Sequence, residues 1–110
     1  MTFQRLSREF DALRAEYRKS MAEKLDRIEA LWELILKGMH DDTRLAQLKR
    51  ELHTIAGSAG TFGLPQVGDA ARAAEDCLGE AADLATLDAK QRDDFARLLG
   101  NLKSAARAPH

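Results

Sequence analysis

Apolar residues recur along most of this chain at steps of three and four positions, which is the spacing of one face of an α-helix. The most regular stripe lies mid-chain and comprises Leu45, Leu48, Leu52, Ile55, Ala59 and Phe62. It predicts an amphipathic helix over about 42–62. Stripes on either side predict further helices over about 20–37, 64–83 and 86–106.

The N-terminal stripe is shorter, and it comprises Phe3, Leu6, Phe10 and Leu13. A polar run over 16–20 separates it from the next stripe and suits a bend, with Ser20 as an N-cap. We therefore expect a separate helix over about 1–19 that covers one end of the remaining helices.

Short connections join the predicted helices, so that successive helices should be antiparallel neighbours. Gly63 breaks the central helix, and Pro65 suits the first turn of the next. Thr86 or Asp88 can cap the last helix. The sequence predicts an all-α fold: an antiparallel up-down four-helix bundle with an additional N-terminal helix, built by residues 1–110 as a single domain.

Size and composition narrow the classes of function. At 110 residues with 32% charged residues and a formal charge of −1, acids and bases are interspersed. No basic face is available for nucleic acid. Cys77 is the only cysteine, which excludes an internal disulfide and predicts a reduced, cytoplasmic compartment. No apolar run approaches the roughly 18–20 residues of a membrane span, and charges by residue 5 argue against a signal peptide. Met1 is typical of a natural start, although the chain can equally be a domain of a larger kinase.

The main candidate for chemistry is His53, at the edge of the central stripe, where we expect it to be at the surface. Gly57 follows one turn later and Gly60 nearly one turn after that. A glycine inside a helix costs roughly 0.5–1 kcal/mol relative to alanine. Two explanations are open. The glycines give a partner clearance to reach the imidazole, or they allow close packing of another helix.

The turn at Gly63 relates the central helix to the next one. Both helices rise about 1.5 Å per residue, so that residues ten positions before and after the turn lie at the same height. His53 should therefore lie near residues 72–76, of which Arg72, Glu75 and Asp76 are polar.

The string HTIAGSAGTFGL over 53–64 resembles the signature of histidine-containing phosphotransfer (HPt) domains, and its second half is similar to that domain of chemotaxis-type histidine kinases. The resemblance implies a phosphorelay intermediate of two-component signalling. His53 would carry a phosphoryl group on Nε2, and Glu75 would accept the Nδ1–H and so orient the ring. The implied partners are a histidine kinase or hybrid kinase and a response-regulator receiver domain, docking around Ala56, Gly57 and Gly60.

We expect a phosphocarrier and not an enzyme in its own right. The chain has no glycine-rich phosphate loop and no carboxylate cluster suited to Mg²⁺. It should hold no cofactor, with Mg²⁺ supplied by the partner.

The family usually has Lys or Arg three positions after the histidine, where this chain has Ala56. Lys49 and Arg50 lie one turn before His53 but lean away from it. Arg72 is a candidate substitute.

Other readings remain at this point. Ala56 favours a degenerate HPt-like module that docks a receiver or kinase domain without phosphotransfer. A metal-binding bundle would need paired Glu-x-x-His elements, but Arg50 stands three residues before His53. His40 with Asp41 and Asp42 has no further ligand at a useful spacing and is expected to be a capping loop. We expect a monomer.

Overall fold

The computed structural model describes residues 2–38, 42–81 and 84–108, and these ranges contain helices and no strand. The helices are α1 (Thr2–Leu36), α2 (Asp42–Ser58), α3 (Pro65–Leu78) and α4 (Ala89–Arg107), with a short 3₁₀ helix, η1 (Leu84–Thr86), before α4. The prediction of an all-helical fold with four bundle helices is confirmed. Of the connection predicted over 39–43, residues 39–41 lie outside the described residues, and residues 42–43 belong to α2.

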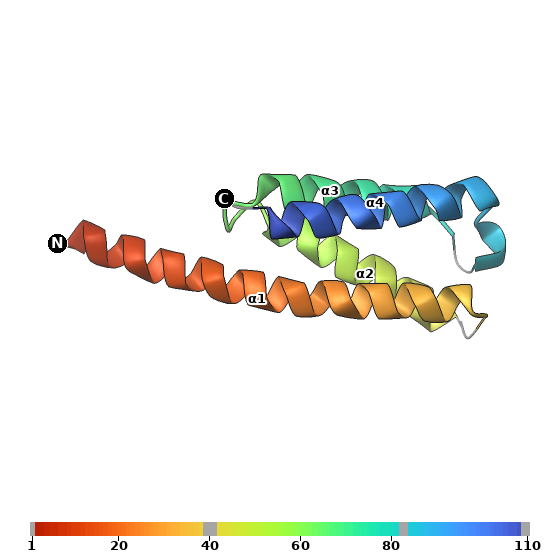
Figure 1. Cartoon of the computed structure of the whole chain (residues 1–110), viewed down its shortest axis with the longest axis horizontal. Helices are drawn as coiled ribbons and strands as arrows, with labels where there is room; N and C mark the ends of the chain where they lie inside the picture. Colours follow the sequence, from red (N-terminus) through yellow and green to blue (C-terminus); the bar gives the residue numbers. More distant parts are fainter. Residues whose placement is uncertain (1, 39–41, 82–83, 109–110) are drawn as a thin grey trace.

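Each long helix runs back along the one before it (Figure 1). The α3 helix packs between α2 and α4, while α1 contacts α2 and, less extensively, α4. None of these helices, over the ranges just given, carries an apolar stretch long enough to cross a membrane.

The core lies along the axis of the bundle and takes apolar side chains from all four long helices. The central stripe is buried from Leu45 to Ala59, as its periodicity predicts. Trp32 of α1 and Phe95 of α4 meet with ring centroids 4.5 Å apart. No polar or charged residue is buried among those described. The bundle is therefore held together chiefly by hydrophobic burial.

The expectation of a separate N-terminal helix is wrong, because α1 is continuous through the polar run 16–20. That run contains no glycine or proline to break the helix, and Ser20 lies inside the helix and not at its start. Residues 2–13, called the overhang below, extend beyond the other three helices (Figure 1). Leu6, Phe10 and Leu13 of the overhang are exposed and cover no end of the bundle.

The connection between α2 and α3 begins earlier than predicted. The α2 helix ends at Ser58, and residues 59–63 form turns that are closed by a hydrogen bond from the Leu64 amide to the Ala59 carbonyl, at 2.9 Å. Gly63 has φ +78°, which favours glycine, and Pro65 begins α3 as predicted.

The other predicted boundaries differ by a few residues. The α3 helix ends at Leu78, where Gly79 takes a positive φ of 54°. The last helix begins at Ala89, because Asp88 forms a capping box with Gln91. Of the two predicted caps, Asp88 is the one that the structure uses, while Thr86 lies in η1.

Candidate functional site

His53 lies on the exposed side of α2, next to the buried Leu52. Its side chain is 78% exposed. The stripe from Leu45 to Ala59 packs in the core, so that the side of α2 with His53 faces solvent. The imidazole is therefore accessible to a partner while the helix that carries it is fixed from behind.

Glu75 of α3 faces the imidazole ring. Its Oε2 lies 3.0 Å and its Oε1 3.3 Å from Nδ1 of His53. Ala71, Ala74 and Leu78 anchor α3 in the core, which leaves Glu75 at the margin facing α2. A carboxylate can only accept a hydrogen bond, so that this contact requires a proton on Nδ1. In the neutral imidazole Nε2 then has a free lone pair, and Nε2 is the nitrogen away from Glu75.

The two glycines after His53 do not serve helix packing. A Cβ added at Gly57 or at Gly60 would meet no atom within 4 Å beyond the neighbouring backbone. The glycine that lies against α2 is instead Gly68 of α3, which is buried and whose added Cβ would be in ordinary van der Waals contact with the Ala56 carbonyl oxygen, at 3.5 Å. The sequence reasoning did not single out Gly68, although its place beside Val67 in the apolar face was a usable signal.

The predicted cations are spread around the site and do not converge on His53. The Lys49 ammonium donates a hydrogen bond to the Ala81 carbonyl, beyond the C-terminal end of α3. Arg50 is exposed, and so is Arg72, which forms an ion pair with Asp69 one turn away at 3.8 Å. Ala56 is half-buried and packs against the core. The position three residues after His53 therefore has a methyl group and no charge.

Next to the open glycines, α1 packs on the turn that follows α2. The rings of Tyr17 and Phe62 stack with centroids 4.3 Å apart, and the Tyr17 hydroxyl lies 2.7 Å from Oγ of Ser58. Arg14 donates a hydrogen bond from Nε to the Phe62 carbonyl at 3.1 Å. The sequence analysis missed this contact because it assigned the run 16–20 to a bend. The signal was Tyr17 itself, four residues after Leu13 and four before Met21.

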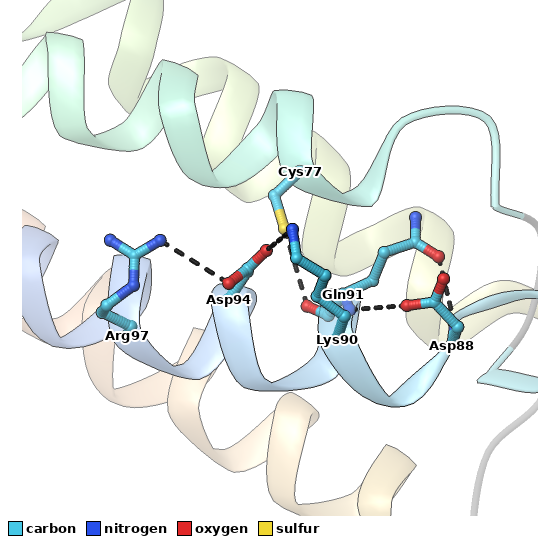
Figure 2. Close-up of polar contacts among 6 residues, drawn as sticks. All are labelled: Cys77, Asp88, Lys90, Gln91, Asp94 and Arg97. Atoms are coloured by element: carbon cyan, nitrogen blue, oxygen red, sulfur yellow. Dashed lines mark hydrogen bonds and ion pairs between the residues drawn. The ribbon is translucent and has the colours of Figure 1, made fainter.

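Cys77 lies on another face of α3 and belongs to the seam with α4. Its thiol donates a hydrogen bond to the Gln91 carbonyl at 3.6 Å, close to the ion pairs that Asp94 forms with Lys90 and Arg97 (Figure 2). Burial, followed by the negative charge of Asp94, raises the pKa of the Cys77 thiol from its ordinary value. The thiol is therefore protonated at neutral pH and takes no part in the His53 site.

Within the described parts of the chain, no group of three or more histidine, cysteine or carboxylate side chains is placed to bind a metal ion. Of the His40 group, His40 and Asp41 lie outside these residues. A paired histidine and carboxylate with a free ring nitrogen on an open helix face is what a phosphoacceptor needs.

Comparison with family models matches residues 12–108 of the chain to the Hpt domain. The chain belongs to the Hpt domain family. Hpt domains are phosphocarrier modules that act in two-component signalling with histidine kinases and response-regulator receivers. No curated protein and no solved structure matches the chain. The match begins inside the overhang, so that Leu6 and Phe10 lie outside the part of the chain that the Hpt model describes.

Proposed function

We propose that this Hpt domain carries a phosphoryl group on Nε2 of His53 between a histidine kinase or hybrid kinase and a response-regulator receiver domain. The observation that carries the proposal is the contact of Nδ1 with the Glu75 carboxylate at 3.0 Å. It leaves Nε2 as the nucleophile on an open helix face.

The proposed reaction is reversible and balances without a cofactor in this chain. The Nε2 lone pair attacks the phosphorus of an aspartyl phosphate, the bond from phosphorus to the carboxylate oxygen breaks, and the carboxylate leaves. Nδ1 keeps its proton throughout. The ring gains positive character when Nε2 forms its bond to phosphorus, and the negative Glu75 stabilises that charge. Mg²⁺, if needed, is held by the partner.

The docking face proposed for the receiver lies around Ala56, Gly57 and Gly60, next to His53. Open space at both glycines supports this choice, because a partner can approach the α2 backbone there. Arg50 and Arg72 are exposed, and either side chain would have to turn towards a phosphoryl group on His53 to pair with it. Arg72 would have to exchange its exposed ion pair with Asp69, a pair that contributes little in water. Lys49 is less available to pair with the phosphoryl group, because its ammonium donates a hydrogen bond to the Ala81 carbonyl.

The test uses a panel of purified receiver domains charged with radiolabelled acetyl phosphate. Wild-type chain is expected to take up label that is lost in acid and kept in alkali, which is the behaviour of phosphohistidine. The His53→Gln variant is expected to remain unlabelled. If a receiver binds the wild type and His53→Gln equally and labels neither, the chain is a docking module without phosphotransfer.

Two expectations from the sequence remain predictions. The single cysteine is the basis for a cytoplasmic location. A monomer is expected in solution, which sedimentation can test.

A further inference from the structure

The overhang of α1 presents an apolar stripe that the bundle does not cover. Leu6, Phe10 and Leu13 are 59%, 44% and 52% exposed. Tyr17 continues the stripe at helical spacing, and Tyr17 packs against Ser58 and Phe62 at the end of α2. The exposed stripe therefore points to the side of α1 on which α2 lies, just beyond the α2–α3 turn.

We infer that this stripe is a second part of the docking surface for the receiver domain, continuous with the face around His53. The inference rests on the proposed function, since it takes the same partner and extends the same interface. Two of the three stripe residues, Leu6 and Phe10, lie outside the Hpt family match, because that match begins at residue 12.

The distances suit one partner domain. Phe10 lies two turns before Tyr17, and His53 lies five residues before Ser58, which Tyr17 contacts. The helical rise then separates Phe10 from His53 by about 18 Å along the bundle. A globular domain of about 100 residues has a radius of gyration of about 13 Å. Such a domain, seated on Gly57 and Gly60, would also reach the stripe.

A second copy of this chain fits the stripe less well. Glu9 and Glu16 flank the stripe on one side and Arg14 on the other. Glu9 is already paired with Arg5 of its own helix at 3.4 Å, so that an antiparallel copy would gain little from the charges beside the stripe. Two parallel overhangs would pair Glu9 with Arg14, but the partner helix would run into the turn packed on Tyr17.

The size of the stripe leads to the same choice. A stable interface buries about 800 Å² on each partner and involves about 20–30 residues a side. The overhang has one apolar face over three turns of helix, which is too small to hold a dimer alone. As an extension of the His53 face it adds apolar contact to a transient complex, and weak signalling complexes have interfaces of this kind.

The experiment compares two double variants of the full chain. Leu6→Gln with Phe10→Gln removes two of the three apolar side chains of the stripe, and Ala12→Gln with Ala15→Gln changes the opposite, exposed face of α1 as the matched control. Each is assayed with the receiver that labels wild type fastest in the panel. Circular dichroism on each variant checks that the helix is retained.

We expect the stripe variant to raise KM for the phosphorylated receiver by about tenfold. Its transfer rate at saturating receiver should stay within about twofold of wild type, because His53 and Glu75 are untouched, and the control should match wild type. Unchanged KM and receiver affinity in the stripe variant would overturn the inference while leaving phosphotransfer intact.

The remaining outcomes separate the inference from the proposed function. A wild type that binds a receiver through the stripe without being labelled would overturn phosphotransfer and support the docking surface. A wild type that neither binds nor takes label from any receiver would overturn both. If sedimentation finds a dimer that the stripe variant alone dissociates, a second copy covers the stripe and the receiver does not.

Discussion

Glu75 holds the imidazole of His53 through Nδ1, with carboxylate oxygens at 3.0 and 3.3 Å. The two side chains come from antiparallel helices whose backs are fixed in one core. The ring therefore has a set orientation although its other nitrogen faces solvent. The contact accounts for both the tautomer and the direction of the nucleophile.

Removing that carboxylate should slow phosphotransfer. We expect Glu75→Ala to lower the rate from a phosphorylated receiver by about 10- to 100-fold. The rate of Glu75→Gln should lie between those of Glu75→Ala and wild type, because an amide oxygen still accepts a hydrogen bond from Nδ1–H. Nitrogen NMR of the ring provides a separate readout: wild type should have the proton on Nδ1, and Glu75→Ala should move it towards Nε2. Equal rates for Glu75→Ala and wild type would remove Glu75 from the mechanism.

We expect that Gly57 lowers the stability of α2 and in return leaves room for a partner to approach His53. Gly57→Ala is expected to raise the free energy of unfolding by about 0.5–1 kcal/mol, because the added methyl meets no neighbour and alanine favours helix. The rate of phosphotransfer to Gly57→Ala should be lower than to wild type, and the rate to Gly57→Leu lower still, because a larger side chain blocks the partner's approach. The control is Gly100→Ala on α4, where the space is also open and transfer should not change. A loss of stability in Gly57→Ala, measured by urea unfolding, would restore the packing explanation.

Ala56→Lys should restore the charge that most members of the family carry. A lysine there leans towards the N-terminus of α2 and so towards a phosphoryl group on His53. We expect a severalfold faster transfer to His53, with an advantage that shrinks as salt rises. Ala56→Gln has a long side chain without the charge and should stay near wild type. If glutamine accelerates transfer as much as lysine, the effect belongs to side-chain volume.

Cys77 should react slowly with thiol reagents until the pH is high. Its pKa is raised by burial and then by Asp94, so that less thiolate is present at pH 8 than in the unfolded chain. The rate of alkylation against pH should have its midpoint at a higher pH in the folded chain than in the urea-unfolded chain. Asp94→Asn should lower that midpoint. The raised pKa adds stability that is present below the unfolded pKa of the thiol and lost as pH rises through the folded value. A folded-chain midpoint at or below that of the unfolded chain would contradict this account.

The closeness of His53 and Glu75 could be predicted by counting residues on either side of the turn. The contact between α1 and the turn after α2 could not be predicted in this way. A tight turn at Gly63 and a fixed rise per residue were sufficient to bring Glu75 near His53, and the structure has them in contact. The roles of these residues are still predictions. The stack of Tyr17 on Phe62 joins segments 45 positions apart in the sequence, and no periodic pattern specifies such a pair.

The observed helix boundaries differ from those predicted from hydrophobic periodicity, and the differences have physical reasons. Polarity over 16–20 was read as a bend, but polar residues suit a helix whose outer face meets water. Phe62 kept the apolar period of α2 and still lies in a turn, where it packs on Tyr17 of another helix. Periodicity identified the helices and most buried positions but did not locate the end of α2, after which Gly60 and Gly63 weaken the helix.

The overhang also affects how the molecule moves through solution. With extents of 57 × 21 × 20 Å, the chain is almost three times as long as it is wide. Its radius of gyration is 15.6 Å, while a compact chain of this length would have about 13 Å. Such a rod tumbles anisotropically and diffuses more slowly than a sphere of equal mass. Elution from a sizing column would therefore overstate its mass, and a monomer would elute where a small dimer is expected.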